Sequence, residues 1–552
     1  MSPQVTYRLA DSTTVEPLIN QWAVWSDMIA PAPYSMHLKH YQIKTLWSYL
    51  DNPELHIKAC RNPKLAGGPF VDISVEHVDK VRALLGSMER QRSNLELAKA
   101  IAEVYERLAR DAKGQSLEPF YNKLPECLRG YTELVYDYYN HPIIRLMEGP
   151  LYASPYYNRE LQSLRFFTVQ RDDSRRFFLS TPRLLDEDEI DWRVSFESLE
   201  IDELFRIELS PRPLGYIREV MGLGQQQENA LLPFLSSEPT LRHETWQEPR
   251  PHIRYLGHAC VLVEWNGISI MTDPWIGAIP RYGGLERISY RELPKKIDFA
   301  LITHAHHDHF VPETLLRLRH RIDCLVVPKT FGLFYTDPSL KLLARQIGFK
   351  NVIELDSLDT IELPGGEIIA APFLGEHADL PHGKSAYVVR LGKESILFGA
   401  DSNCLDRRLY EHLHRSIGDI ETVFLGMECV GAPLSWLYGA LLPYRIQHDH
   451  DVSRRTRGSN AEAALALLEA VGGKRVYVYA MGQEPWFQYG MGLGLSEDSI
   501  QVKEADKLIQ KAREIGFLDA QRLYGRADIY LEALPSGKQV RSSSTISVNG
   551  FE

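Results

Sequence analysis

The feature that most constrains this chain is residues 301–310 (LITHAHHDHF), where a short apolar run leads directly into residues that bind metals. Four of them, His304, His306, Asp308 and His309, have the spacing His-x-His-x-Asp-His. In an extended segment residues i and i+2 point to the same side, so His304 and His306 can hold one ion together. As the chain turns, Asp308 and His309 reach a second ion, and two ions about 3.5–4 Å apart can share a bridging ligand. A histidine-rich surface turn is the alternative, but this spacing after a strand-like run favours a two-metal site.

The motif resembles that of the metallo-β-lactamase superfamily, and the resemblance extends from about residue 250 to about residue 535. It implies an α/β fold of four layers, αββα, with a dinuclear metal site at one edge of the sheets. It also singles out Asp273, which follows a strand expected at residues 268–271. In the superfamily this aspartate orients a metal-binding histidine by accepting the N–H of its other ring nitrogen. An ordinary Asp-Pro turn is the alternative interpretation.

Two further carboxylates follow expected strands. Asp401 comes after the apolar run 395–398, at the place where the superfamily has an aspartate that bridges the two ions. A glycine-rich turn without a metal is the alternative. Glu428 comes after the apolar run 423–427 and is our candidate for a proton-transfer group, with a surface glutamate as the alternative.

The segment 372–379 (PFLGEHAD) decides what kind of metal the site prefers. Hydrolytic members of the superfamily place a histidine ligand here. Glu376 and His377 point in opposite directions if the segment is extended, so only one of them is expected to bind. His377 would give a histidine-rich site that suits zinc, whereas Glu376 would add a hard oxygen donor that favours iron or manganese.

The last ligand of such a site is expected to be a C-terminal histidine. After His414 the chain contains only His448 and His450. We predict His448, with His450 as the alternative. Many hydrolases instead place this histidine just ahead of a helix, where this chain has Arg457. The ligand therefore comes from a looser loop or is absent.

Further segments, whose similarity is less specific than that of the metal-binding motif, narrow the resemblance to one oxidative branch of the superfamily. They are residues 375–379, 427–431, 435–439 and 479–486, together with the long N-terminal extension. The chain is similar here to the family of the diiron amino-acid β-hydroxylase of chloramphenicol biosynthesis. The resemblance implies an antibiotic-biosynthesis oxidoreductase, a monooxygenase with two non-haem iron ions and Glu376 as an iron ligand. Its substrates would be dioxygen and an amino acid held as a thioester on the carrier domain of a nonribosomal peptide synthetase.

Other partners follow from the same comparison. The sequence contains no ferredoxin-type cysteine cluster and no flavin fingerprint, so the electron donor would be an external reductase. Self-association as a homodimer is expected by analogy with the family. The competing hypothesis is a dinuclear zinc hydrolase of an ester, phosphodiester or amide. Trp436, Tyr438, Trp486, Phe487 and Tyr489 would either wall a substrate pocket or pack in the core.

Length predicts more than one domain for the 552 residues. The polar, proline-punctuated stretch 236–251 separates an N-terminal domain, 1–245, from a catalytic domain, 246–535, with a polar tail at 536–552. The N-terminal domain is expected to be mixed but largely helical, with helices over 71–110 and 124–147. Dimerisation, partner docking and a lid over the site remain open as its role.

Composition excludes several classes of protein. A net charge of −11 and a pI near 6.0 argue against nucleic-acid binding. The six cysteines are scattered, the N-terminus lacks a secretion signal, and no run of about 20 apolar residues is present. These features predict a cytoplasmic enzyme that does not cross a membrane.

Overall fold

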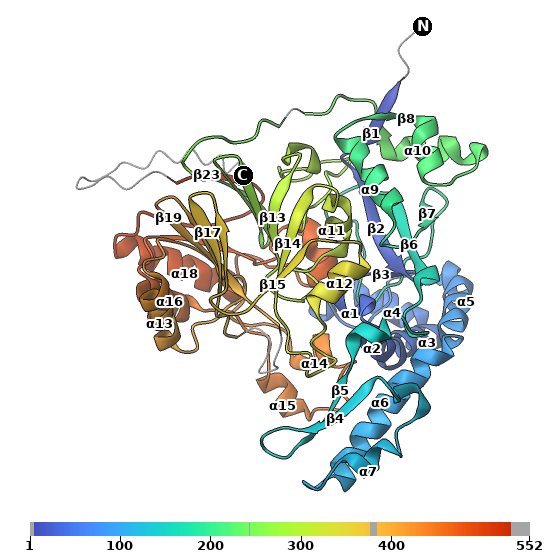
Figure 1. Ribbon diagram of the computed structural model, residues 1–552. Helices are drawn as coiled ribbons and strands as arrows, with labels where there is room; N and C mark the ends of the chain where they lie inside the picture. The colour runs from blue at the N-terminus through green and yellow to red at the C-terminus, as the bar shows by residue number, and fades with distance from the viewer. Residues whose placement is uncertain (1–4, 242, 376–382, 532–552) are drawn as a thin grey trace.

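The computed structural model describes residues 5–241, 243–375 and 383–531. Figure 1 shows two parts lying side by side, an N-terminal part in blue to green and a C-terminal part in green to red. The C-terminal part consists of two packed sheets with helices outside them, and the metal-binding motif lies within it.

Seven strands form the first sheet: β10 (His252–Gly257), β11 (Cys260–Trp265), β12 (Ile268–Thr272), β13 (Ile297–Leu301), β14 (Ile322–Pro328), β15 (Val352–Leu355) and β23 (Ala527–Tyr530). Their order is β15-β14-β13-β12-β11-β10-β23. The pairs from β12 to β15 are parallel, and the others are antiparallel. The β11–β12 hairpin turns at Asn266 and Gly267, which have φ angles of 47° and 82°. Asn and Gly are the residues that most readily adopt positive φ angles in a two-residue hairpin turn.

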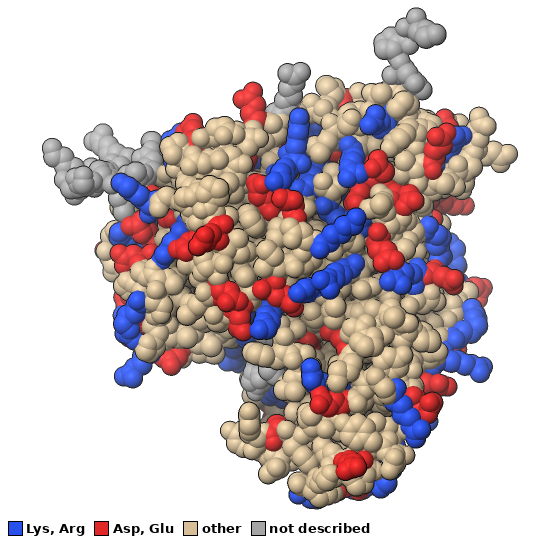
Figure 2. Space-filling view, viewed as in Figure 1, with Lys and Arg blue, Asp and Glu red and all other residues tan. Residues whose placement is uncertain are grey.

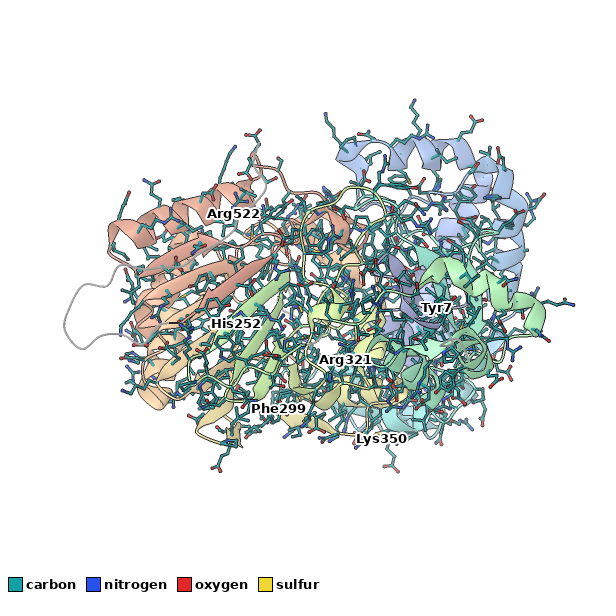
Figure 3. The ribbon with its side chains drawn as sticks, turned by 90° about the horizontal axis from the view of Figure 1, so that it is seen from above. Tyr7, His252, Phe299, Arg321, Lys350 and Arg522 are labelled. Carbon is teal, nitrogen blue, oxygen red and sulfur yellow. The ribbon has the colours of Figure 1, made fainter. Side chains whose placement is uncertain are left out.

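Seven further strands form the second sheet: β16 (Thr360–Leu363), β17 (Gly366–Ala371), β18 (Ala386–Leu391), β19 (Glu394–Phe398), β20 (Thr422–Gly426), β21 (Arg475–Tyr479) and β22 (Asp519–Arg522). They follow one another in chain order across the sheet. Seen from above in Figure 3, His252 and Phe299 lie on the first sheet and Arg522 lies on the second.

The two sheets pack face to face over a core of alternating apolar side chains, such as Val261, Val263, Val389 and Phe424. Helices α13 (Arg407–Ile417), α16 (Ala461–Val471) and α18 (Ile500–Glu514) cover the outer face of the second sheet. Helices α11 (Pro312–Leu318) and α12 (Leu340–Gln346) lie on the outer side of the first (Figure 1). The layers are therefore αββα, as predicted for the C-terminal part of the chain. The shorter helices of this part are α14 (Leu434–Tyr438), α15 (His448–Ser453) and α17 (Gln488–Met491).

The N-terminal part combines helices with three small sheets. The sheets have the orders β3-β2-β6-β7, β8-β1-β9 and β4-β5. The strands are β1 (Thr6–Leu9), β2 (Thr13–Ile19), β3 (Trp22–Ala23), β4 (Thr132–Tyr136), β5 (Pro142–Leu146), β6 (Gln162–Thr168), β7 (Ile190–Arg193), β8 (Arg212–Pro213) and β9 (Leu235–Ser236). The helices are α1 (Ser26–Ile29), α2 (Pro31–His37), α3 (Ile43–Asp51), α4 (Pro53–Cys60), α5 (Val78–Glu89), α6 (Arg92–Asp111), α7 (Glu118–Tyr121), α8 (Glu148–Leu151), α9 (Leu199–Phe205) and α10 (Leu214–Val220).

Two sequence predictions for this part need correction. The helical region expected over 71–110 begins later and is two helices, α5 and α6, which are separated at Arg90 and Gln91. The helix expected over 124–147 is wrong, because β4 and β5 form an antiparallel hairpin there. Asn140 turns the hairpin with a φ of 60°, and the strands bury Leu134 and Ile144 towards α6. Tertiary contacts with α6 thus determine the secondary structure of residues 132–146, where the local sequence pattern is ambiguous.

Buried ion pairs join the two parts. Arg175 contacts Glu313 of α11 at 2.6 Å, and Arg319 contacts Asp202 of α9 at 2.8 Å. All four side chains are nearly inaccessible to solvent. Because desolvation offsets much of the attraction in a buried pair, such pairs mainly fix how two surfaces fit together.

The surface carries charges of both signs. In Figure 2 lysine and arginine side chains alternate with aspartate and glutamate over the visible face, and no single-sign region dominates that face. Within the described residues, no helix combines the length and apolar character that a membrane crossing requires.

Candidate metal centre

His304 and His306 begin the centre directly beyond the end of β13. Nε2 of His304 and Nδ1 of His306 lie 3.0 Å apart, so the two rings converge as the i, i+2 spacing predicts. Both side chains are buried. Burial lowers the pKa of His304 well below its usual value and lowers the pKa of His306 to about 4. Both rings are therefore neutral at pH 7, and each keeps a lone pair that a metal can use.

A hydrogen-bond chain fixes which nitrogen of His304 carries the proton. The hydroxyl of Thr303 donates to Oδ2 of Asp273 at 2.7 Å, so its oxygen accepts from Nδ1 of His304 at 3.0 Å. The lone pair of His304 is thus on Nε2, facing His306. On the other side of the pair, Nε2 of His306 lies 2.5 Å from the hydroxyl of Tyr438. Outer contacts of this kind hold ligating rings in place.

His309 shows most directly that the centre is built for a cation. Its Nδ1 donates to Oδ2 of Asp273 at 2.8 Å, which leaves the lone pair on Nε2. That Nε2 lies 3.0 Å from Oδ2 of Asp401, so the two atoms can approach this closely only with a proton or a metal ion between them. Burial lowers the pKa of His309, but Asp401, Asp308 and Asp273 outweigh it and hold the pKa well above its usual value. The site therefore retains a positive charge between the ring and the carboxylates.

Asp401 supplies the oxygen atoms between the two groups of histidines. Its Oδ2 is 3.0 Å from Nε2 of His309 and 3.5 Å from Nε2 of His304. Oδ1 is buried and has no hydrogen-bond partner among the described residues, and the same is true of Nε2 of His309. Buried polar atoms without hydrogen-bond partners are rare in proteins, and a bound metal ion would satisfy such atoms. The residues present thus fit bound metal ions, to which Asp401 would supply a carboxylate.

His258 is the residue that sequence reasoning missed. It lies in the turn between β10 and β11, and its Nε2 is 3.2 Å from Oδ2 of Asp308. Its position suits a ligand, but its tautomer argues against that role. The backbone N–H of Gly482 donates to Nδ1 at 3.1 Å, so a neutral ring carries its proton on Nε2. Nε2 is buried and has no hydrogen-bond partner among the described residues, so its 3.2 Å approach to Asp308 is an electrostatic contact that places the ring beside the carboxylate.

Strained backbone accompanies these side chains. His258, Asp273, Ala400 and Ala480 have φ angles of 48°, 35°, 44° and 53°, a region that residues other than glycine rarely adopt. His258 and Asp273 contact residues of the centre, and Ala400 directly precedes Asp401. Such strain of about 1–3 kcal/mol per residue persists only where the surrounding structure imposes it, and it is concentrated at functional sites.

Comparisons with known proteins agree with this geometry. Residues 8–239 match the family model described as the diiron non-heme beta-hydroxylase N-terminal domain, and residues 252–401 match the beta-lactamase superfamily domain. A curated relative from Streptomyces venezuelae is 34% identical over 537 residues, which cover 95% of this chain and 100% of the relative. That relative is named 4-amino-L-phenylalanyl-[CmlP-peptidyl-carrier-protein] 3-hydroxylase.

The chain belongs to the diiron non-heme β-hydroxylases. The crystal structure of CmlA, a diiron beta-hydroxylase from Streptomyces venezuelae, superposes on this β-hydroxylase with a TM-score of 0.88 and 33% identity. It covers 96% of this chain and 100% of that one. A glutamate-to-aspartate variant of CmlA gives a TM-score of 0.85 at 34% identity, with 95% and 100% coverage. The resemblance stated from the sequence is therefore confirmed for fold and family.

Glu376 and its alternative His377 lie outside the described residues of this β-hydroxylase. The residues that flank them border the centre. The ring of Phe373 is 5.5 Å from that of His304, and Lys384 forms a β-bridge with His304. Nζ of Lys384 also donates to the backbone oxygen of Gly375 at 2.6 Å.

The structure places His448, the predicted last ligand, on the surface of the protein. It is exposed at the start of α15, and His450 is exposed in the same helix. The helix has no buried residue, because its sequence HDHDVS offers no apolar face. Asp451 instead ties α15 to α14, accepting from the backbone N–H of Ser435 at 2.7 Å.

Glu428 follows β20 and is half-buried. Its backbone oxygen accepts from the N–H of Gly458 at 2.8 Å. A Cβ atom added to Gly458 would lie 3.4 Å from both the backbone oxygen of Asp401 and the backbone nitrogen of Glu428. The main chains of Asp401 and Glu428 thus approach the same glycine.

Proposed function

We propose that this enzyme hydroxylates the β-carbon of an amino acid held as a thioester on the carrier domain of a nonribosomal peptide synthetase. Dioxygen would be the co-substrate, and electrons would come from an external reductase. The proposal is supported by a full-length relative whose name specifies a 3-hydroxylase acting on a carrier-bound aminoacyl group. When bound, two iron ions would supply the oxidising chemistry that cleaves an unactivated C–H bond.

One observation carries the metal assignment. Nε2 of His309 faces Oδ2 of Asp401 at 3.0 Å while Asp273 holds the ring proton on the far nitrogen. Two buried acceptors at this distance repel each other unless a proton or a metal ion lies between them, and the buried Oδ1 of Asp401, which has no hydrogen-bond partner among the described residues, favours a metal ion. Asp308 and Asp401 give the described set two oxygen donors, and Glu376 would add the third that favours iron over zinc.

The residues divide between two ions in this proposal. His304, His306 and Asp401 would hold one ion, together with Glu376 from the segment that Phe373 and Lys384 flank. Asp308, His309 and Asp401 would hold the other. His258 orients Asp308, Asp273 orients His309, and burial of the whole set excludes bulk water. Glu428 is proposed to move protons between the centre and solvent.

The N-terminal part is proposed to form a wall of the active site. The hydroxyl of Ser26 donates to the backbone oxygen of Ala305 at 2.5 Å, within the metal-binding motif. Trp25 also contacts the ring of His307, with centroids 6.1 Å apart. Of the three roles considered from the sequence, these contacts support a cover over the centre. Self-association and docking of the carrier remain additional proposals.

The decisive experiment uses the iron-loaded enzyme, a chemical reductant, dioxygen and a panel of aminoacyl-carrier conjugates. Mass spectrometry of the carrier is expected to show the addition of one oxygen atom to one conjugate. A zinc-loaded sample of the same protein serves as the matched control and should give no addition. Hydrolysis of an ester, phosphodiester or amide by the zinc form, with no oxygenation by the iron form, would favour the hydrolase.

A further inference from the structure

Lys384 lies alongside the metal-binding motif, and main-chain contacts fix its place there. It forms an antiparallel β-bridge with His304. The backbone N–H of the next residue, Ser385, donates to the backbone oxygen of Thr303 at 2.8 Å. Lys384 is half-buried, whereas His304 and Ser385 are buried. The Lys384 side chain therefore starts next to the first metal-binding histidine, whatever arrangement its long carbon chain adopts.

Two contacts set the position of the ammonium group of Lys384. Its Nζ donates to the backbone oxygen of Gly375 at 2.6 Å and lies 5.3 Å from the centroid of the Phe373 ring. A cation and an aromatic ring attract each other at this distance. The Phe373 ring in turn packs against the ring of His304, with the centroids 5.5 Å apart. A single aromatic ring therefore separates the positive charge of Lys384 from the proposed ligand His304.

The centre itself carries negative charge. Asp308 and Asp401 are buried among the histidines, and the buried Asp273 accepts from His309. Carboxylates attract Fe(III) more strongly than Fe(II), because the ferric ion has the larger charge. They therefore lower the reduction potential of an iron site, which depends on its net charge. Carboxylates alone would make this centre hard to reduce, although the proposed reaction takes electrons from an external donor.

A fixed cation near the centre has the opposite effect. Reduction of one ion from Fe(III) to Fe(II) adds one electron and removes one unit of positive charge. A lysine ammonium repels Fe(III) more than Fe(II), so its presence favours the reduced ion and raises the potential. The residues of the motif are buried, and electrostatic effects are stronger where water is excluded.

We propose that Lys384 is a positioning residue of the metal centre, and that its positive charge, held beside His304, raises the reduction potential of the iron pair. The charge acts through space across the Phe373 ring, and Lys384 is not a ligand in this proposal. The hydrogen bond to Gly375 keeps the ammonium in place. The assignment rests on the proposed iron-dependent hydroxylation and adds to it the group that helps an external donor to reduce the centre.

The test measures the midpoint potential of the iron-loaded enzyme in an anaerobic titration with redox mediators, followed by visible absorption. Lys384→Met removes both the charge and the hydrogen bond, whereas Lys384→Gln removes the charge and leaves a donor for Gly375. Both variants should have a more negative potential than the wild type. The affinity for Fe(III) relative to Fe(II) should rise about 3- to 10-fold, which corresponds to about 30–60 mV for a one-electron step. Lys384→Arg keeps the charge and should stay close to the wild type.

Lys474→Met is the matched control for the loss of one lysine. Lys474 precedes β21 and pairs with Glu421 at 2.7 Å, whereas Asp401 follows β19. Because β19, β20 and β21 are parallel, Lys474 and Asp401 lie at opposite ends of the second sheet, and this variant should keep the wild-type potential.

The series distinguishes the charge of Lys384 from its structural contacts. Wild-type potentials in both Lys384→Met and Lys384→Gln would overturn the assignment. A shift in Lys384→Met alone would assign the effect to the hydrogen bond with Gly375 and would also overturn it. So would a negative shift in Lys384→Arg as large as that in Lys384→Gln. Iron content is measured in every sample, and if Lys384→Met fails to fold, the comparison of Lys384→Gln with Lys384→Arg decides.

Turnover of aminoacyl carriers by the same preparations separates the two proposals. Hydroxylation of a conjugate by the wild type, with no shift in potential in the charge-removing variants, would overturn the role of Lys384 and leave β-hydroxylation standing. The expected shifts in an iron-loaded enzyme that hydroxylates no conjugate would support the role of Lys384 and overturn the reaction.

Discussion

Nε2 of His258 lies 3.2 Å from Oδ2 of Asp308, and the opposite ring nitrogen accepts the backbone N–H of Gly482. The relationship connects a turn at the start of the first sheet to the metal-binding motif. It places His258 beside Asp308 as a group that can position the carboxylate, a role distinct from that of a metal ligand. The distinction has measurable consequences for metal stoichiometry and for metal affinity.

We expect His258→Ala to keep the metal stoichiometry of the wild type at saturating iron, while its affinity falls about 10- to 100-fold, as for other groups that orient ligands. His258→Gln, whose amide can donate to Asp308, should recover part of that loss. Titration of the apoprotein with Fe(II) under anaerobic conditions, followed by metal analysis, provides both quantities. His448→Ala is the control and should behave as the wild type. Loss of one ion per chain in His258→Ala would instead make His258 a ligand.

Asp273 gives a second prediction, because it holds the proton of His309 on Nδ1 at 2.8 Å and also accepts from Thr303. Asp273→Asn removes the negative charge that fixes this tautomer. Iron affinity should fall about 10- to 100-fold. Competition with a chelator of known affinity measures the change. Asp298→Asn, on the same sheet and bonded to Ser269, is the matched control and should leave iron binding unchanged. Equal effects of the two substitutions would mean that the loss is one of general stability.

Much of this arrangement could be predicted from the sequence, because its determinants are local. The spacing of His304 and His306 and the strands before Asp273 and Asp401 all follow from short patterns. The role of His258 could not be read in this way, since it depends on Gly482, which a different sheet brings to the turn. The one signal in the sequence was the pair Gly257-His258, because a glycine before a histidine can mark a turn. The structure confirms the turn with a φ of 112° at Gly257.

The remaining differences have the same origin. His448 was predicted as the last ligand because few histidines remain after His414, and the structure shows it exposed on α15, where no local pattern identifies its role. The hairpin at 132–146 was mistaken for a helix because its structure depends on packing against α6, which the local sequence pattern does not reveal. The ion pair between Arg175 and Glu313 joins residues that no local rule would connect.

The role of Glu376 as an iron ligand is a prediction, and the identity of the bound metal tests it. Glu376→Ala should lower bound iron or abolish turnover, because it removes the oxygen donor proposed for the first ion. His377→Ala should do less and serves as the matched neighbour. Both variants are compared by metal analysis after expression with iron and zinc available together. The reverse order of effects would support a histidine-rich zinc site.

The last prediction concerns pH and a buried carboxyl group between the two parts. Glu148 of α8 accepts from the backbone N–H of Ser339 at 2.8 Å and from the hydroxyl of Tyr152 at 2.8 Å. Burial raises the pKa of Glu148 from 4.5 to about 7, and nearby Asp337 adds to the increase. The folded state therefore keeps a proton, between pH 4.5 and about pH 7, that the unfolded chain releases.

This contribution to the free energy of unfolding is fully present below about pH 4.5 and is lost as the pH rises through about 7. The loss should amount to roughly 3 kcal/mol, at about 1.4 kcal/mol per pH unit. The side chain of Glu148→Gln is uncharged at all pH values, like the protonated carboxyl group that it replaces. The urea midpoint of this variant should therefore fall less than that of the wild type between pH 5.5 and pH 7.5. Glu133→Gln removes a half-exposed carboxylate that pairs with Arg145 and should keep the wild-type slope. Parallel pH profiles for Glu148→Gln and the wild type would show that Glu148 is already ionised in the folded enzyme.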